Sequence, residues 1–383
     1  MADLRLEAVG DLSRVPRDAW NALAGADWSP FLEWDWLRAL EEAGCVGPRT
    51  GWAPCHLLAW DGDALVGAVP LYQKGHSAGE FVFDWGWAEA AARVSVRYYP
   101  KLLAAVPFTP AAGRRLLAAP GREGVVVPLL AQALDAMAQQ LGMSSVHVLF
   151  ATRAEVDALA QDGWAARATL QFQWRNHGYA TFDDFLSRLN AKKRAQIRRE
   201  RRAVAGSGLD IEVRTGEAVD AALLQTMYRW HTATVAKWGW SDQYLNERFY
   251  QLLGEHFRAR LHLVVALRRG RPIAAAFNVL KGGALWGRYW GCEEEVPFLH
   301  FEVCYYRAIE DCIARGVGLF SPGAGGEHKY HRAFVPEAQW SAHRLIDPRL
   351  AALIVPALAR EVPYVLAQIE QLAGTSPLKR GPP

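Results

Sequence analysis

The chain has 383 residues, of which 51% are hydrophobic and 22% charged, and its formal net charge is +3. This is an ordinary globular composition with enough length for two domains. The charge is too small to argue for nucleic-acid binding by itself, no apolar run approaches the roughly 18 residues of a membrane span, and Asp3, Glu7 and Asp11 do not suit a signal peptide. We therefore expect a cytoplasmic enzyme without a transmembrane segment.

The cysteines do not indicate a disulfide framework or a thiolate zinc site. They stand at positions 45, 55, 292, 304 and 312, an odd number without a C-x-x-C pair. Cys304 and Cys312 fall on the apolar face of a predicted helix, where we expect them to act as small core residues.

The first ninety residues predict one helix and three strands. Six tryptophans in the first sixty residues are expected to pack in a core. The sequence Pro30-Phe-Leu-Glu-Trp34 opens a helix that runs to Ala43. Residues 56–60 and 64–72 flank Asp61-Gly62-Asp63 as a hairpin, and residues 81–87 follow as a third strand.

Residues 98–101 and 108–110 form an aromatic and basic segment that prolines interrupt. It lacks the periodicity of a helix or strand, so we expect a loop. This loop either lines a cleft or is a turn whose tyrosines pack as lids. A helix over 127–141, a buried strand over 145–150 and a helix over 153–162 follow.

A strongly basic helix is predicted after residue 181. Thr181 resembles the start of a capping box, and the helix continues through residues 192–202, where seven of eleven side chains are basic. Arg194, Arg198 and Arg201 share a face at helical spacing and would clamp an anion there. A solvated helix face is the alternative interpretation.

A three-strand pattern appears twice. Two helices over 227–240 and 244–260 precede strands over 262–267, 273–280 and 284–290. His56-Leu57 recurs as His262-Leu263, and Lys74-Gly75 recurs as Lys281-Gly282. This repetition predicts a duplicated α/β domain.

The densest functional chemistry lies between residues 284 and 331. A helix over 300–315, which ends at Gly316, holds His300 and Glu302 in its first turn, and a short buried strand over 317–320 leads into a loop. In this loop Gly323, Gly325 and Gly326 permit close approach of a ligand. The next three residues supply a base, Glu327, a proton shuttle, His328, and a cation, Lys329.

Other interpretations of this segment remain. Glycine-rich loops are often tight turns, and a His or Glu at a helix start is often a solvated cap. His300-x-Glu302 and Glu327-His328-x-x-His331 contain enough ligands for a metal hydrolase, but they match neither H-E-x-x-H nor H-x-x-E-H. We expect no metal. At the C-terminus, residues 350–372 predict a helix with kinks at Pro356 and Pro363, and residues 376–383 a disordered tail.

Several blocks resemble a bacterial family of peptidoglycan biosynthesis/recognition proteins, or predicted N-acyltransferases. That family is related to the Fem peptidyltransferases and to the GNAT acetyltransferase superfamily. The matching blocks are Tyr98-Tyr-Pro-Lys-Leu102, Val106-Pro-Phe-Thr-Pro110, Gly287-Arg-Tyr-Trp-Gly291, Leu299-His-Phe-Glu-Val-Cys-Tyr-Tyr306, Gly326-Glu-His-Lys329 and Arg332-Ala-Phe-Val-Pro336. Two departures are visible, because the family pattern has Gly-Ala-Gln-Gly before Glu327 and Arg-Gly-Phe at residues 332–334.

The resemblance implies an α/β fold with tandem, duplicated GNAT-like domains of mixed sheets flanked by helices. We expect domains over 1–165, completed by 345–375, and over 166–344. The implied reaction is transfer of an acyl or aminoacyl group from acyl-CoA or aminoacyl-tRNA to a small-molecule or peptide amine, without a tightly bound cofactor. A non-catalytic protein that recognises a peptide or cell-wall precursor in a degenerate cleft is the alternative.

The resemblance also suggests roles for residues. Glu327 is the preferred base, with His328, His300 and Glu302 as the other candidates. Substrate-binding candidates are Arg288, Tyr289, Trp290 and Lys329, together with Tyr98, Tyr99, Lys101, Phe108 and Thr109 from the first domain, which we expect to meet Glu327 in a cleft between the repeats. Donor-binding candidates are Arg194, Arg198, Arg201, Gly325 and Gly326. The GNAT pyrophosphate junction would fall at residues 291–299, yet its glycine-rich pattern is absent and Glu293, Glu294 and Glu295 would repel phosphate, which keeps charged tRNA as a candidate donor.

Overall fold

The computed structural model describes residues 4–25, 29–237 and 244–379. These residues form two compact units. Unit 1 comprises Met1–Leu170 and Ala338–Gln368, and unit 2 comprises Gln171–Glu337 and Ile369–Pro383. The strands β9 (Ala165–Arg175) and β15 (Val335–Leu345) carry the chain from one unit into the other.

Unit 1 contains two groups of strands. The first has the order β1-β3-β4-β7 and is antiparallel throughout. The second has the order β15-β8-β6-β5-β2, in which β6 and β8 are parallel. The bounds are β1 (Arg5–Val9), β2 (Trp52–Pro54), β3 (His56–Asp61), β4 (Ala64–Val69), β5 (Leu71–Lys74), β6 (Lys101–Ala104), β7 (Leu117–Ala118) and β8 (Ser145–Ala151).

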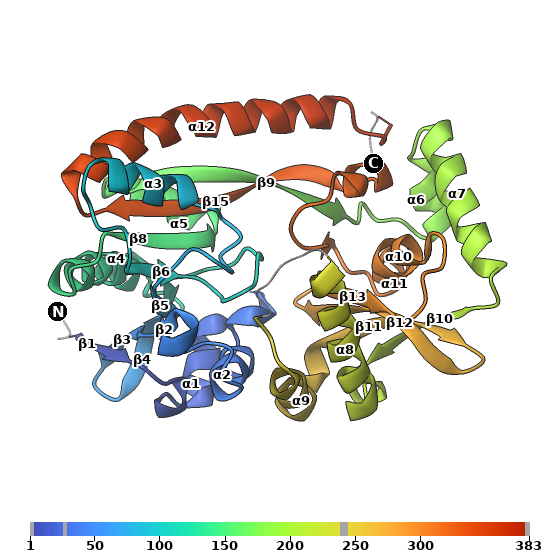
Figure 1. The fold of residues 1–383 in the computed structure, drawn as a ribbon, viewed down its shortest axis with the longest axis horizontal. Coiled ribbons are helices and arrows are strands. Elements are labelled where there is room, and N and C mark those ends of the chain that lie inside the picture. Colours follow the sequence, from blue (N-terminus) through green and yellow to red (C-terminus); the bar gives the residue numbers. More distant parts are fainter. Residues whose placement is uncertain (1–3, 26–28, 238–243, 380–383) are drawn as a thin grey trace. The chain divides into compact units, whose positions relative to one another are not determined.

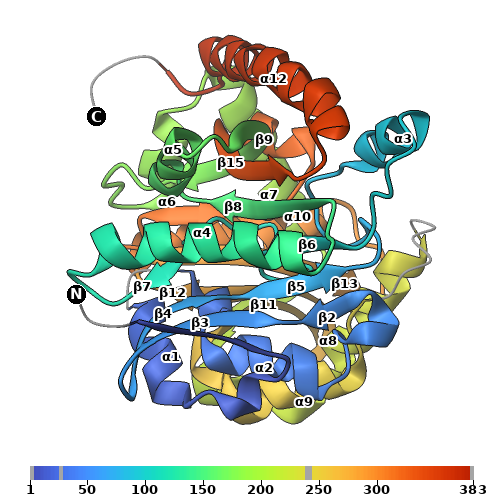
Figure 2. The same cartoon turned by 90° about the vertical axis from the view of Figure 1, so that its left-hand side faces the viewer.

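Helices cover these strands (Figures 1 and 2). They are α1 (Arg17–Ala24), α2 (Trp34–Glu42), α3 (Trp85–Arg93), α4 (Glu123–Gln140), α5 (Arg153–Gln161) and α12 (Pro348–Gly374), with 3-10 turns at Leu12–Arg14, Pro30–Leu32 and Pro48–Thr50. The helix α4 buries Val126, Leu130 and Leu134, which recur at the spacing of one helix face, in the main core of this unit. A smaller cluster joins α3 to α12 through Trp87, Leu350 and Ile354.

Unit 2 has the strand order β10-β11-β12-β13-β14-β9. Its strands are β10 (Asp210–Thr215), β11 (Leu261–Arg268), β12 (Arg271–Lys281), β13 (Ala284–Cys292) and β14 (Leu319–Ser321), and only β13 and β14 pair in parallel in this group. Its helical segments are α6 (Phe182–Ser187), α7 (Ala191–Ala205), α8 (Ala221–Lys237), α9 (Glu247–His256), α10 (Leu299–Phe301), the π-helical η6 (Glu302–Tyr306), α11 (Arg307–Ala314) and the 3-10 helix η7 (Glu327–Arg332), with 3-10 turns at Gly216–Ala218 and Arg258–Arg260.

Most predicted elements are confirmed. The helix that ends near Ala43, the hairpin of β3 and β4, and α4, β8 and α5 lie where the periodicity placed them, and so do β11, β12 and β13. The predicted helix over 227–240 corresponds to α8, and residues 238–240 lie outside the described residues. The strands β9 and β15 were not predicted.

Two predictions for unit 1 are wrong. Residues 81–87 form no strand, because Trp85 starts α3, whose alanine-rich sequence favours a helix over the β-propensity of its aromatic residues. Lys101 does not lie in a loop but starts β6. The buried ammonium of Lys101 pairs with two carboxylates, so its polar character did not indicate solvent exposure.

Two further corrections concern unit 2. The predicted single helix after Thr181 is two helices, because Asn190 starts α7 by accepting a hydrogen bond from the Lys193 amide. The predicted disordered tail is ordered over residues 376–379. Its backbone bonds to the segment between the two helices, from Asn190 N to the Pro377 carbonyl and from Lys379 N to the Arg188 carbonyl, whereas residues 380–383 lie outside the described part.

The C-terminal helix α12 bears on the expected absence of a transmembrane segment, which stays a prediction. By length and composition α12 could cross a membrane, since an 18-residue window has a mean hydropathy of 1.6. Core helices of water-soluble proteins can meet the same criteria, so this finding alone is weak evidence for a span. The prediction had considered only uninterrupted apolar runs.

Candidate functional site

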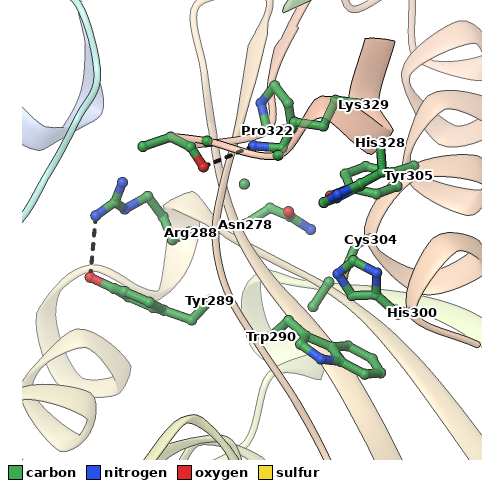
Figure 3. A pocket seen from close by; sticks show the side chains of 15 residues that line it. Asn278, Arg288, Tyr289, Trp290, His300, Cys304, Tyr305, Pro322, His328 and Lys329 are labelled. Atoms are coloured by element: carbon green, nitrogen blue, oxygen red, sulfur yellow. Dashed lines mark hydrogen bonds between the residues drawn. The ribbon is translucent and has the colours of Figure 1, made fainter. Parts of the chain in front are cut away.

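Unit 2 contains a pocket of about 230 Å³. It is lined by parts of β12, β13, α10, η6, the loop before η7 and the start of η7 (Figure 3). The pocket is small compared with the several hundred Å³ of a typical ligand site, so it suits the reacting end of a larger ligand.

The pocket opens where two parallel strands separate. The strands β13 and β14 pair from Ala284 with Leu319 to Trp286 with Ser321, and the chain after Ser321 then turns away at Pro322. Beyond this point, residues 287–290 of β13 line the pocket. Ligand sites are common at the carboxyl ends of parallel strands for this reason.

A β-bulge directs Arg288 into the pocket. In the pairing of β12 with β13, Phe277 lies opposite Tyr289 and Asn278 opposite Gly287, so Arg288 is an extra residue in the strand. Such bulges re-aim a side chain and are frequent next to active sites. Figure 3 shows Arg288 and Tyr289 on one side of the pocket, with His328, Tyr305 and His300 on the other.

The helix after β13 contains one π-helical turn. The segments α10, η6 and α11 form one helical stretch, and η6 carries Cys304 and Tyr305, which line the pocket. A π-turn inserts one residue into the helical repeat and is common at functional sites. It brings the Tyr305 hydroxyl to 2.8 Å from Nε2 of His328.

The loop before η7 depends on glycine. Gly323, Gly325 and Gly326 have φ angles of 86°, 67° and 87°, which residues with a side chain rarely adopt. A Cβ atom on Gly326 would also come within 2.7 Å of the His328 ring. This backbone brings the side chains of His328 and Lys329 into the pocket.

A buried arginine anchors η7 to the basic helix α7. Arg332 donates from Nη1 to the His328 carbonyl at 3.0 Å and from Nε to the Tyr306 hydroxyl at 2.8 Å. It also forms an ion pair with Glu200 of α7 at 3.0 Å, and both side chains are nearly inaccessible to solvent. The backbone of His328 is therefore bound to an arginine that an ion pair fixes to α7.

Lys329 is a buried cation with a lowered pKa. Its Nζ donates to the carbonyls of Gly323 at 2.8 Å and Ala324 at 3.1 Å, and burial lowers its pKa to about 8. An ammonium has three N–H groups. Among the described residues these two carbonyls are its only hydrogen-bond acceptors, which leaves one N–H for a ligand.

The two pocket histidines are neutral at pH 7. Burial, with smaller contributions from neighbouring charges such as Lys329 and Arg332, lowers the pKa of both His300 and His328 to about 4. Burial also raises the pKa of Tyr305 and that of Cys304, so both stay protonated. The residues described as lining the pocket include no Asp or Glu.

The structure brings most of the predicted second-domain residues together. Arg288, Tyr289, Trp290, His300, Gly325, Gly326, His328 and Lys329 all line the pocket. Glu327, the preferred base, is solvent-exposed and does not line it. Glu302 is buried on another face of the helix, where it pairs with Arg201 at 3.0 Å.

The three arginines predicted as an anion clamp have separate partners. Arg194 donates to the Leu189 carbonyl, and Arg198 pairs with Asp183 at the surface. Arg201 is bound by both Glu302 and Glu310. The acidic residues expected to repel phosphate are also paired, Glu293 with Arg271, Glu294 with Arg268 and Glu295 with Lys237.

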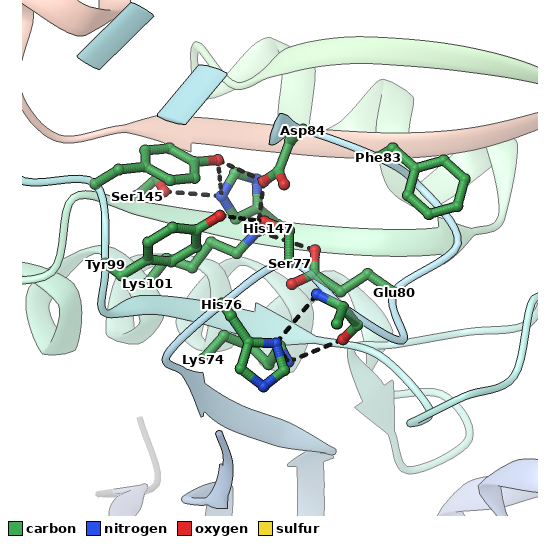
Figure 4. Close-up of polar contacts among 12 residues, drawn as sticks. Lys74, His76, Ser77, Glu80, Phe83, Asp84, Tyr99, Lys101, Ser145 and His147 are labelled. Carbon is green, nitrogen blue, oxygen red and sulfur yellow. Dashed lines mark hydrogen bonds and ion pairs between the residues drawn. The ribbon is translucent and has the colours of Figure 1, made fainter. Parts of the chain in front are cut away.

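The candidates from the first domain lie within unit 1. Tyr98, Lys101, Phe108 and Thr109 are buried there, and Tyr99 is partly exposed. Lys101 pairs with Glu80 at 2.9 Å and with Asp84, while the Tyr99 hydroxyl bonds to Ser77 at 2.7 Å (Figure 4). Their contact with substrate, and the expected meeting of Lys101 with Glu327, stay predictions.

Sequence reasoning missed three pocket residues that have a polar or titratable side chain, namely Asn278, Cys304 and Tyr305. Asn278 offered a signal, because it is a polar residue within an otherwise apolar strand and is 1% exposed. Tyr305 offered no such signal, since a regular helical period does not reveal a π-turn. The described residues contain no group of three or more His, Cys, Asp or Glu side chains that could hold a metal ion.

Comparisons with known proteins identify the family and the fold. The FemAB-like family, described as peptidoglycan biosynthesis/recognition, matches residues 11–380. A search of curated protein sequences finds no match.

Among solved structures, FemX is similar over 88% of this chain and 98% of its own, with a TM-score of 0.56 and 9% identity. The L-PGS protein of Bacillus licheniformis is similar over 93% of this chain and 98% of its own, with a TM-score of 0.52 and 11% identity. A tandem GNAT protein from the clavulanic acid biosynthesis pathway matches at a TM-score of 0.42 and 11% identity, over 90% of this chain and 99% of its own. At these identities the structural likeness concerns the fold, a mixed α/β architecture with large sheets flanked by helices. The family match covers nearly the whole sequence, and the chain therefore belongs to the FemAB-like family of peptidoglycan biosynthesis/recognition proteins.

Proposed function

We propose that the chain transfers an acyl or aminoacyl group to the amine of an acceptor, with the pocket of unit 2 as the reaction site. The observation that carries this proposal is the buried ammonium of Lys329 beside the neutral pair Tyr305 and His328. Amide formation needs both features, because negative charge develops on the acyl oxygen while the attacking amine loses a proton. The family's description supports a peptide of the peptidoglycan type as the acceptor.

The reaction begins when a neutral amine attacks the acyl carbon. A C–N bond forms, and the third N–H of Lys329 donates to the carbonyl oxygen as it becomes an oxyanion. The amine proton passes to the Tyr305 hydroxyl oxygen while that hydroxyl gives its own proton to Nε2 of His328. The pKa of about 4 keeps His328 neutral and able to accept this proton.

The intermediate then collapses. The carbonyl re-forms, the bond between the acyl carbon and the oxygen or sulfur of the donor breaks, and the leaving group takes the proton back from His328 through Tyr305. An imidazolium with a low pKa gives up its proton readily, so the same feature serves both halves of the reaction. Arg288, across the pocket, is placed to bind an anionic group of donor or acceptor.

The surroundings favour charged tRNA over acyl-CoA as the donor. The amides of Leu299 and Phe301 at the start of the helix already bond to the carbonyls of Val296 and Phe298, so this helix start is not an open pyrophosphate site. In contrast, α7 packs against η7 and exposes a row of cations, Lys192, Arg198, Arg199 and Arg202. A polyanionic donor bound along this row would lie next to the pocket.

A direct transfer assay tests this proposal. The purified chain would be incubated with charged tRNA or an acyl-CoA and with amine acceptors, including peptides of the peptidoglycan stem type, and amide products would be identified by mass spectrometry. We expect an amide from charged tRNA, which is lost in Lys329→Met. The absence of amide product from both donors would contradict the proposal.

A further inference from the structure

The part of α12 that belongs to unit 1, residues 348–368, has an outer face of unusual composition. Between Leu350 and Ala367 the only charged residues are Arg360 and Glu361. The inner face packs Leu350, Ile354 and Leu358 into the cluster that joins α12 to α3. The outer face exposes Ala352, Leu353, Val355, Pro356, Ala359, Pro363, Tyr364 and Ala367. Helices on the surface of water-soluble proteins ordinarily present charged and polar side chains there.

Exposed aromatic rings stand beside this face. Phe83 and Trp85, at the start of α3, stack with ring centroids 4.9 Å apart and are 55% and 54% exposed. Arg167 joins them to α12, because its guanidinium donates to the Phe83 carbonyl at 2.9 Å and to Glu361 at 3.0 Å. Tyr364, one helical turn beyond Glu361, is 72% exposed. Apolar and aromatic exposure is therefore concentrated on two neighbouring elements of unit 1.

The charge of this region is positive. Arg167 neutralises Glu361, whereas no carboxylate pairs with Arg360 in the described part of the chain. The helix α3, which packs on α12, and the turn after it expose two cations, Arg93 and Arg97. They expose only one carboxylate, Glu89, in the same segment. Cations at the rim of an apolar helix face, with Trp and Tyr rings beside it, are typical of helices that lie in the headgroup region of a bilayer.

We propose that this face of α12, with Leu353, Val355 and Tyr364, together with Phe83 just before α3 and Trp85 at its first position, docks unit 1 on the surface of a membrane that contains anionic phospholipids. The helix lies in the plane of the interface and does not span the bilayer, because spanning would remove Leu350, Ile354 and Leu358 from the core of unit 1. A membrane with anionic phospholipids suits this face better than a second copy of the chain, because Arg360, Arg93 and Arg97 attract an anionic surface and would repel the same cations of a second copy. The two large side chains with amphipathic rings, Trp85 and Tyr364, suit a boundary between apolar and aqueous surroundings.

Co-sedimentation of the full chain with vesicles tests this proposal. The vesicles would contain equal parts of phosphatidylglycerol and phosphatidylcholine, or phosphatidylcholine alone. The test variant is Leu353→Glu with Tyr364→Glu. The matched control is Val125→Glu with Leu141→Glu, which adds the same charge at exposed apolar positions on and directly after α4. Melting temperatures would confirm that all proteins are folded.

We expect the unaltered chain and the control to bind the anionic vesicles. We expect the affinity of the test variant for the same vesicles to be lower by a factor of about ten or more. Should the test variant not fold, Phe83→Ser with Trp85→Ser takes its place. An unaltered chain that stays in the supernatant would overturn the proposal, as would equal binding by test and control variants. Sedimentation velocity without lipid provides the remaining check. If the unaltered chain and the control are dimers, the test variant is a monomer and none of the three binds vesicles, the face belongs to an interface with a second copy instead.

Discussion

At the scale of single residues, the account depends on Tyr305 and His328 acting as one unit. If the amine proton passes through both, removing either one breaks the same path, so Tyr305→Phe, His328→Asn and the double variant should all lower kcat by a similar factor of about a hundred or more. Their effects on transfer rate would be measured as a double-mutant cycle. Additive losses would mean that the two side chains act independently.

Protonation of the pocket histidines predicts how stability depends on pH. The pKa of His300 and of His328 falls from 6.5 in the unfolded chain to about 4 in the folded protein. Below pH 6.5 the unfolded chain therefore binds more protons, so the stability that these groups contribute is complete above pH 6.5 and is lost as the pH falls through about 4. The free energy of unfolding in urea should be lower at pH 5 than at pH 7.

The variant His300→Gln with His328→Gln checks this assignment. The free energy of unfolding of this variant should depend less on pH than that of the unaltered chain. Part of the dependence should remain, because burial also lowers the pKa of His147 and His343 in unit 1. An unchanged pH dependence of the free energy of unfolding would contradict the assignment to His300 and His328.

At the scale of elements, the ion pair between Glu200 of α7 and Arg332 of η7 joins the two helices. Glu200→Gln leaves a buried guanidinium without its carboxylate, which should lower the free energy of unfolding by about 3 kcal/mol or more. The exposed pair of Arg198 with Asp183 on the same helix is the matched control, and Asp183→Asn should cost less than about 1 kcal/mol. Urea unfolding would compare the two variants, and equal losses would refute a special role for the buried pair.

Sequence periodicity reveals elements better than it reveals local irregularities within them. The strands β11 to β13 and the helix α4 follow from apolar residues at regular spacing. The bulge at Arg288 and the π-turn at Tyr305 each add one residue to a regular element without changing the apolar pattern around it, and both shape the pocket. The parallel pairing of β13 with β14 joins residues more than thirty positions apart, which no local pattern shows.

The segment predicted to hold the site supplies most of the residues that line the pocket, but the prediction did not show which of its side chains face the pocket. The glycines of residues 323–326 marked the loop, because close backbone approach requires them. Whether a side chain on the short helix η7 faces the pocket depends on its tertiary contacts, and the glycines carry no information on this point. For that reason His328 and Lys329 line the pocket while their neighbour Glu327 faces solvent.

At the scale of the whole molecule, the basic surface of α7 predicts how the donor binds. Replacing Lys192, Arg199 and Arg202 by Gln should weaken binding of charged tRNA and reduce the slope of log affinity against log salt, since fewer counterions are released. Replacing the buried Arg201 disturbs its pairs with Glu302 and Glu310 and is a poorer test. Affinity would be measured over a series of salt concentrations, and an unchanged slope would remove α7 from the donor site.

The measurement that tests the central claim most directly compares two neighbours on η7. Lys329→Met removes the buried cation from the pocket, whereas Glu327→Gln removes an exposed carboxylate outside it. The account predicts that kcat/KM for acyl transfer falls by about a hundredfold to a thousandfold in Lys329→Met and stays near normal in Glu327→Gln, with both proteins folded. Loss of activity in Glu327→Gln, with activity retained in Lys329→Met, would contradict the account and return the role of base to Glu327.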